Sequence, residues 1–369
     1  MPAPNQRTRF SFKRVLFNVF AILVLGAAVI AGYLYTQYQR FADAPIAGLA
    51  QATQVDVPIG ANLPAIVGLL DERGLEPGNP YFWRLLAREL GVAGKLHAGE
   101  YALDAGMTPR ALLKKMAAGE VIQHKFTIVE GWTVWKLVSA LWEDEGIKRA
   151  PCMAEPLNPC MGNALMQKLG EPDMEPEGLF LPETYSYIKG DTDIDILRRA
   201  RDATKKTLDK LWGQRTPDTP LKTPYEALIL ASIVEKETAR PEERPKIAQV
   251  FLTRLKLGMK LQTDPTVIYG KYYANPSLSQ LPVDIGGLNI TRNDLVTDNP
   301  YNTYTRIGLP PTPIALPGKA ALEAVIHPAQ TDALYFVARG DGTHEFSSTL
   351  EAHNRAVARY QLNRQLHRQ

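Results

Sequence analysis

The chain has 369 residues, and its 45% hydrophobic content is that of a globular protein able to bury more than one core. Its 42 basic and 39 acidic residues nearly balance, with a formal net charge of +3 and no long basic run. A nucleic-acid-binding protein is therefore not indicated, and we expect no nucleic-acid partner.

A membrane-spanning helix is expected over residues 15–37, after a basic tail over 1–14. No charged residue lies between Arg14 and Arg40, and the apolar run VLFNVFAILVLGAAVIAGYLY can cross a hydrocarbon core of about 30 Å. A cleaved signal peptide has a shorter apolar core and a small-x-small site, so we favour an uncleaved anchor in contact with membrane lipid. The positive-inside rule then predicts a single-pass protein of the inner (cytoplasmic) membrane, with a cytoplasmic N-terminus and an extracytoplasmic, periplasmic remainder.

After a small-residue and proline linker over 38–50, a compact α+β module is expected over 51–122. The stretch QVDV alternates as a strand, and two amphipathic helices, the second over 79–90, precede the strand-like LHAGEYAL. The segment TPRALLKKMAAGE then begins a helix with proline at its first position and ends it near Gly119. The order strand, two helices, strand resembles a LysM-like unit, which binds glycan chains; a plain spacer domain is the alternative.

Residues 123–369 are expected to form a larger α+β domain with no metal and no cofactor. Cys152 and Cys160 lie in PCMAEPLNPC, and such a closely spaced pair in an exported segment predicts a disulfide-closed loop over 151–163. The six histidines show no zinc-binding spacing, and no G-x-S-x-G motif is present. Further on, EGLFLPETYSYIKGD is rich in turn residues, so Glu177 and Glu183 are expected as solvated loop residues.

The stretch LASIVEKET, residues 230–238, carries two glutamates on an apolar helix. Its start is predicted by TPYE, with Thr223 as N-cap and Glu226 completing a capping box. At about 100° per residue, Glu235 and Glu237 point about 200° apart. Glu237 falls within the apolar stripe and is expected to face inward, whereas Glu235 falls opposite.

Glu237 also lies in the last turn of its helix, because Pro241 follows and a second helix runs to Gly258. Desolvation and the negative helix C-terminus both favour the protonated form of an inward carboxyl, which makes it a suitable general acid for a glycosidic oxygen. The alternative is a structural salt-bridge glutamate.

Several motifs together resemble one family, the YceG/MltG-like endolytic murein transglycosylases. They are LILASIVEKET, RLKLGMKLQTDPTVIYG, YNTYTRIGLPPTPIALPG, HPAQTDALYFVARGDGTHEFSSTLEAHN and EGLFLPETY. The resemblance implies a membrane-anchored enzyme that cuts the glycan strands of peptidoglycan near the membrane, with peptidoglycan synthases as partners. It also implies a catalytic glutamate in EKET, for which helical phase favours Glu237, with Glu235 as the second choice. The implied substrate-binding residues are Glu183, Gln262, Asp264, Tyr269, Asn302 and Tyr304.

The implied reaction needs a single acid/base, because the C6 hydroxyl of N-acetylmuramic acid attacks its own anomeric carbon and leaves a 1,6-anhydro end. Two alternatives remain open from the sequence. One is a water-using muramidase with Glu183 as its second carboxylate. The other is a catalytically silent, glycan-binding scaffold that recruits cell-wall synthases.

Overall fold

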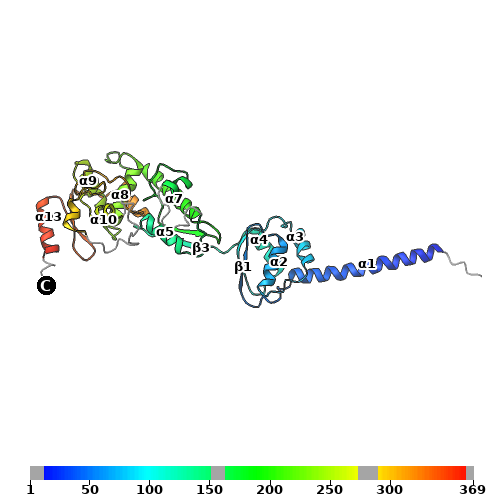
Figure 1. The fold of residues 1–369 in the computed structure, drawn as a ribbon. Helices are drawn as coiled ribbons and strands as arrows, with labels where there is room; N and C mark the ends of the chain where they lie inside the picture. The colour runs from blue at the N-terminus through cyan, green and yellow to red at the C-terminus, as the bar shows by residue number, and fades with distance from the viewer. Residues whose placement is uncertain (1–11, 151–162, 273–289, 363–369) are drawn as a thin grey trace, which may run out of the picture. The chain divides into compact units, whose positions relative to one another are not determined.

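A computed structural model of the protein describes residues 12–150, 163–272 and 290–362. The chain divides into two compact units, Met1–Gln123 and His124–Gln369. Both combine helices with two-stranded antiparallel sheets (Figure 1), so the mixed helix and strand fold is confirmed. Cys152 and Cys160 lie outside the described residues, and their disulfide stays a prediction.

The first unit begins with the long helix α1, Phe12–Asp43. Every side chain from Arg14 to Thr36 is exposed, and the helix is long and apolar enough to cross a membrane. An exposed helix that is apolar all round cannot be stable in water without a partner, whereas a bilayer would cover it.

The end of α1 and the residues after it do not form the linker expected over 38–50. Tyr38 and Ala42 are buried, as are Ile46 and Leu49 beyond the helix, and all four belong to the core of the first unit. The composition of ADAPIAGLAQ suggested a linker, but apolar residues spaced by three or four positions continue a buried stripe from α1 into the unit. The apolar helix is therefore joined to the folded unit through a packed contact.

The rest of the first unit follows the predicted order of strand, two helices, strand and helix. Its elements are β1 (Thr53–Val57), α2 (Leu63–Glu72), α3 (Pro80–Glu89), β2 (Gly99–Leu103) and α4 (Pro109–Ala118). Strand β1 pairs with β2, from Thr53 opposite Leu103 to Val57 opposite Gly99. Side-chain caps begin each helix: Thr108, for example, accepts a hydrogen bond from the backbone N–H of Ala111, and Gly119 ends α4 in the left-handed region.

The second unit places helices around a buried central helix, α8 (Pro224–Glu237). Its other elements are β3 (His124–Thr127), α5 (Val134–Glu143), α6 (Asn163–Lys168), β4 (Thr184–Tyr187), α7 (Asp193–Trp212), α9 (Arg244–Lys256), α10 (Asp264–Tyr272), α11 (Arg292–Val296), α12 (Lys319–Ile326), β5 (Tyr335–Ala338), β6 (His344–Ser347) and α13 (Leu350–Val357), followed by a π-helical turn over Ala358–Leu362. Strand β3 pairs with β4 and β5 with β6, both antiparallel.

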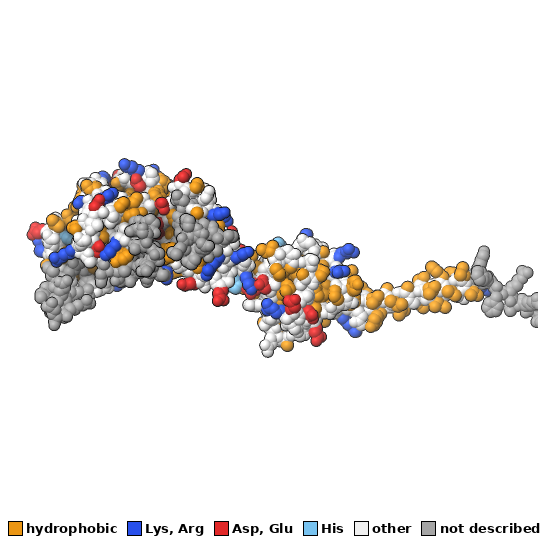
Figure 2. All heavy atoms as spheres, in the orientation of Figure 1, with side chains coloured by type: hydrophobic (Ala, Val, Ile, Leu, Met, Phe, Trp, Pro, Cys, Tyr) orange, Lys and Arg blue, Asp and Glu red, His pale blue; other side chains and the backbone are white. Residues whose placement is uncertain are grey.

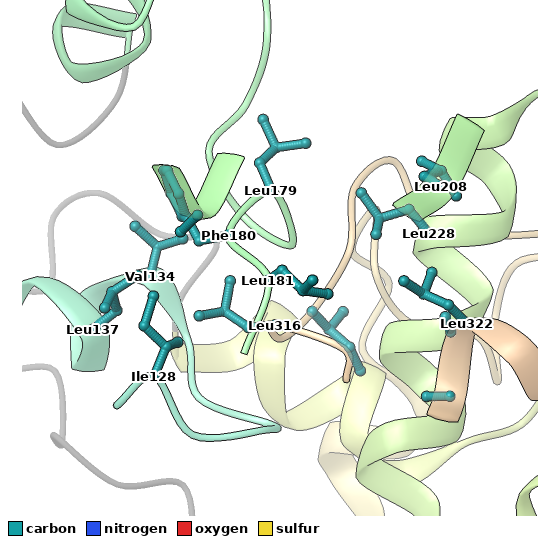
Figure 3. Close-up of a cluster of buried hydrophobic side chains, with 14 of the residues drawn as sticks. Ile128, Val134, Leu137, Leu179, Phe180, Leu181, Leu208, Leu228, Leu316 and Leu322 are labelled. Carbon is teal, nitrogen blue, oxygen red and sulfur yellow. The ribbon is translucent and has the colours of Figure 1, made fainter. Parts of the chain in front are cut away.

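Helix α8 is buried on all sides, because α7, α9, α10 and α12 pack around it. Every residue from Ala227 to Val234 is buried, including Ser232, whose hydroxyl accepts a hydrogen bond from the backbone N–H of Ile314. Figure 3 shows part of this core, with Leu228 of α8 close to Leu208 of α7 and Leu322 of α12. A glutamate in the second half of α8 is therefore at least partly removed from water on either side of the helix.

The N-terminus of α8 is capped differently from the prediction. Thr223 accepts the expected hydrogen bond from the backbone N–H of Glu226. The carboxylate of Glu226, however, accepts from the N–H of Lys222 and not from that of Thr223, so the reciprocal half of the capping box is absent.

Candidate active site

A cleft of about 500 Å³ opens in the second unit where α8 ends. Its walls come from the end of α8, the connection between α9 and α10, the β5–β6 hairpin and α13. The lining residues are Glu237, Arg254, Leu261, Gln262, Asp264, Tyr304, Tyr335, Phe336, Val337, Ala338, His344, Leu350, His353, Asn354 and Val357. Four of the residues predicted for the site, Glu237, Gln262, Asp264 and Tyr304, therefore meet in one cleft.

Glu237 is the last helical residue of α8, and Thr238 after it has extended backbone. Its side chain is half-buried, and its carboxylate accepts a hydrogen bond from the hydroxyl of Thr263. The carboxyl group therefore sits at a helix C-terminus, with its free side toward the cleft. The position in the last turn is as predicted.

The pKa of Glu237 is raised to about 7, and burial of the carboxyl group is the main cause. The charge of Asp264 raises the pKa further, whereas the hydrogen bond from Thr263 and the charge of Arg254 lower it. At neutral pH the carboxyl group is thus present in both protonation states, which is the condition for a general acid that must also act as a base.

The loop that carries Thr263 is held rigidly against the segment around residue 303. The N–H of Thr263 donates to the hydroxyl of Thr303 at 3.0 Å, and this hydroxyl lies 2.9 Å from that of Thr266. The N–H of Gln262 donates to the carbonyl of Thr303. Gln262 itself has a φ of 51°, the left-handed region that side chains other than glycine rarely adopt, so the local fold holds a strained backbone at the cleft wall.

Two further polar side chains in the wall are fixed by their own partners. The hydroxyl of Tyr304 donates to the carboxylate of Asp264 at 2.6 Å. The buried Arg254 donates to the carbonyls of Leu334 and Leu261, and its guanidinium lies 5.2 Å from the centre of the Tyr335 ring. Its positive charge is therefore anchored in the wall without a carboxylate bound directly to it among the described residues.

The hairpin side of the cleft is aromatic and includes histidines that the sequence analysis did not single out. The Nδ1 atom of His344 lies 2.7 Å from the carboxylate of Glu243, which also accepts the N–H of His344 at 2.9 Å. His353 stacks on Tyr335, with 5.2 Å between ring centres. His344 and His353 lie in the sequence stretches GDGTHEF and EAHN, in which polar residues alternate with glycine or apolar residues. This pattern is the feature from which their position at a site could have been predicted.

Glu235 occupies a different environment from Glu237, as the predicted angle between them requires, but it does not face solvent. Its carboxylate accepts from Arg244 at 2.7 Å and from the N–H of Gly318 at 3.0 Å, and Arg244 also contacts Glu130 at 3.3 Å. The side chains of Glu235 and Arg244 are only 5% and 7% exposed. Because α8 is surrounded, the side opposite the cleft is a second buried environment, and Glu235 forms an ion pair with Arg244 there.

Glu183 and Tyr269 do not line the cleft. Glu183 is exposed in the loop immediately before β4, as expected of a loop glutamate. Tyr269 donates to the carboxylate of Glu177 at 3.2 Å, on the other side of α10 from Asp264. Glu177 was expected to be solvated, but it is buried and also accepts the N–H of Val134 at 3.1 Å, and burial raises its pKa to about 8.

Asn302 is fully buried and organises the backbone of its own loop. Its two amide N–H groups are shared among the carbonyls of Asp294, Leu295 and Thr297, and its oxygen accepts the backbone N–H of Tyr304 at 2.9 Å. All four hydrogen bonds are intramolecular. Asn302 therefore positions Tyr304 and leaves little capacity for a ligand.

Within the described ranges 12–150, 163–272 and 290–362, no group of three or more His, Cys, Asp and Glu side chains could hold a metal ion.

Comparisons with known proteins agree on one family. Residues 55–359 match the YceG-like family. The chain is 28% identical over 319 residues to an endolytic murein transglycosylase of Bacillus subtilis, covering 83% of this chain and 84% of the relative. It is 29% identical over 370 residues to a protein of the same name from Streptococcus pneumoniae, of which it spans 65%. A crystal structure of a yceG-like protein from Listeria monocytogenes shares 28% identity with a TM-score of 0.50, over 83% of this chain and 99% of that one.

Proposed function

Since this chain belongs to the YceG-like family, we propose that it is an endolytic murein transglycosylase, a lyase that cuts the β-1,4 bond between N-acetylmuramic acid and N-acetylglucosamine within peptidoglycan strands. Cleavage leaves 1,6-anhydro-muramic ends and so terminates or releases strands near the membrane. The observation that carries this proposal is the environment of Glu237: its half-buried carboxyl group faces an open cleft, and its pKa is raised to about 7.

In the proposed reaction, the protonated carboxyl of Glu237 donates its proton to the glycosidic oxygen while the bond from this oxygen to the anomeric carbon breaks. The C6 hydroxyl oxygen of the same muramic residue then bonds to the anomeric carbon. Its proton passes to the Glu237 carboxylate, which is thereby restored. One carboxyl group is sufficient because no water is consumed, in contrast to glycosidases that use two carboxylates.

The remaining cleft residues supply what a polar sugar polymer needs. Gln262 and Asp264 offer amide and carboxylate groups, and Tyr304 offers a phenol held at a fixed place by Asp264. Arg254 provides a fixed positive charge near the carboxyl group, which favours the carboxylate formed when Glu237 gives up its proton.

A water-using muramidase needs a second carboxylate close to the glycosidic bond that Glu237 would protonate. Glu183 is exposed and does not line the cleft, so its position does not favour this mechanism. Asp264 lines the cleft, but its carboxylate accepts from Tyr304. We therefore keep hydrolysis as an outcome of the test below.

Helix α1 and the α+β module of the first unit support the same proposal. Helix α1 would anchor the protein in the cytoplasmic membrane with its N-terminus inside, and the β1–α2–α3–β2 arrangement would serve as a LysM-like glycan-binding module. The catalytic unit would then lie on the outer side of that membrane, periplasmic in a cell with two membranes. Peptidoglycan synthases, which make the strands, would be its protein partners.

The test is mass spectrometry of peptidoglycan digested with the full chain in detergent, beside a Glu237→Gln variant. Anhydro-muramic ends that appear with wild type and disappear with the variant are the expected result. Reducing ends would mean hydrolysis, and absence of any cleavage by wild type would favour the glycan-binding scaffold. A soluble fragment must begin before Tyr38, because Tyr38 and Ala42 belong to the core of the first unit.

A further inference from the structure

Helix α3 carries an exposed face whose composition differs from an ordinary solvated surface. Tyr81, Arg84, Leu85 and Arg88 recur at the spacing that places residues on one side of a helix, and all four are exposed. Tyr81 is 74% and Leu85 49% exposed, and the guanidinium of Arg84 lies over the Tyr81 ring at 5.9 Å. This α3 face thus combines an aromatic ring, an aliphatic side chain and two cations.

The α3 face is held close to the end of the apolar part of α1. The Phe82 ring of α3 lies 5.9 Å from the Tyr38 ring and 5.5 Å from the Phe41 ring of α1. The apolar run of α1 ends at Tyr35, only about 4.5 Å along the helix axis before Tyr38. Because Tyr38 and Ala42 are packed in the core, the helix cannot swing independently of α3.

Charges around this joint are arranged with an excess of cations. Asp43 and Glu89 are both bound by Arg110, at 2.8 and 2.7 Å. Arg84 and Arg88 form no ion pair with any described residue. Figure 2 shows Lys and Arg side chains on both sides of the point where α1 leaves the unit.

We propose that the α3 face, Tyr81–Arg84–Leu85–Arg88, docks on the bilayer surface and binds the phosphate groups of lipid headgroups beside the point where α1 emerges. The inference rests on the membrane anchoring in the proposed function. Arginine binds phosphate through two parallel hydrogen bonds, and tyrosine and leucine are typical of side chains that enter the headgroup region. The contact would fix the orientation of the first unit on the membrane, so that α1 acts as more than a tether.

Spin labelling of the full chain in lipid nanodiscs tests the docking. A nitroxide is attached at Leu85→Cys, in a Cys152→Ser/Cys160→Ser background, and its accessibility to oxygen, which concentrates in lipid, is compared with that to an aqueous nickel complex. The reference label is at the exposed position Gln54→Cys in β1. Strand β1 lies on the side of the first unit away from the N-terminal end of α1 (Figure 1). We expect the ratio of oxygen to nickel accessibility to be severalfold higher at position 85 than at position 54.

The arginines are then tested with Arg84→Glu/Arg88→Glu and with a matched control, Lys206→Glu/Lys222→Glu, two exposed lysines of the second unit. Each juxtamembrane cation favours the docked state by about fivefold. Arg84→Glu/Arg88→Glu should therefore abolish the difference in accessibility ratio between positions 85 and 54, and the lysine control should leave it unchanged. Equal docking in phosphatidylcholine and phosphatidylglycerol discs would assign the contact to the shared phosphate, and stronger docking in phosphatidylglycerol to net charge.

A label at position 85 that behaves like the one at position 54 in both lipids would overturn the inference, as would equal effects of the two double variants. Failure of the full chain to co-purify with the discs would overturn the anchor and the inference together. Loss of anhydro-muramic products bears on the enzyme alone, because the labelling does not depend on cleavage.

Discussion

Glu235 and Glu237 are separated by one residue at the end of α8, and the structure surrounds them in different ways. The carboxylate of Glu235 is enclosed with Arg244 and a backbone N–H, whereas that of Glu237 has one hydroxyl donor and faces a cleft. Burial raises the pKa of both groups, but at Glu235 the nearby N–H and guanidinium counteract it directly. We infer that the partners of a buried carboxyl group, more than its burial, separate the ion-pair role of Glu235 from the chemical role proposed for Glu237.

The comparison would break if Glu235 were the acid. We expect Glu237→Gln to reduce strand cleavage by about 10²–10⁴-fold, the usual contribution of a general acid, with the fold intact. Glu235→Gln should retain most cleavage per folded molecule, because residue 235 does not line the cleft and the amide oxygen can still accept from one of the two donors, Gly318 or Arg244. Rates of release of anhydro-muropeptides, normalised to folded protein, measure both; the opposite order would assign the chemistry to Glu235.

The enclosed side is tested through stability. Arg244→Met should lower the free energy of unfolding of the second unit by about 3–5 kcal/mol, because it leaves the buried Glu235 carboxylate without its counter-ion. Adding Glu235→Gln should recover part of the loss, since no buried charge then remains. Hydrogen exchange of α8 and α9 peptides in urea measures the stability of this unit. Equal stability of Arg244→Met and Arg244→Met/Glu235→Gln would show that the loss does not come from an unpaired Glu235 carboxylate.

The open side is tested through pH. Cleavage should fall as the pH rises through about 7, because Glu237 must be protonated to donate to the glycosidic oxygen. Thr263→Val removes a hydrogen bond that lowers the pKa of Glu237, so the alkaline limb should move to higher pH by about one unit, equivalent to about 1.4 kcal/mol. The pH profile of kcat/KM measures this, with Thr253→Val, which lies outside the cleft lining, as a threonine control. An alkaline limb that stays in place in Thr263→Val would show that the Thr263 hydroxyl does not affect the pKa of the acid.

The smallest effect is expected at Gln262. Gln262→Gly should raise the stability of the second unit by about 1 kcal/mol, because glycine adopts the observed φ of 51° without steric cost but loses more chain entropy. If the Gln262 side chain contacts the glycan, cleavage should fall at the same time. Urea unfolding and product release, measured on one preparation, would detect higher stability together with lower cleavage. A lower stability of Gln262→Gly would show that the backbone of Gln262 is not strained.

Local patterns were sufficient for much of the secondary structure. Helices α3 and α4 begin after Asn79 and Thr108 and α8 begins after Thr223, because capping side chains and a following proline specify a helix start from adjacent residues. The apolar run of α1 and the position of Glu237 in a last turn also follow from neighbouring residues alone.

Tertiary structure decided which polar residues meet. Gln262, Asp264 and Tyr304 join Glu237 in the cleft, whereas Asn302, only two positions from Tyr304, is used up by its own loop. Glu177 and Glu183 come from the same turn-rich stretch, yet one is buried and the other exposed. Their environments depend on segments that are distant in sequence.

The sequence by itself determined the apolar helix, the α+β organisation and the approximately 200° between the two glutamates, because these depend on periodicity and adjacent residues. Only the tertiary structure decided that Glu237 faces a cleft, that Arg244 encloses Glu235 on the opposite side of α8, and that the apolar residues between positions 38 and 49 pack into the first unit. Helical phase gives the direction of a side chain relative to its own helix. What lies in that direction is determined by the elements that pack around it.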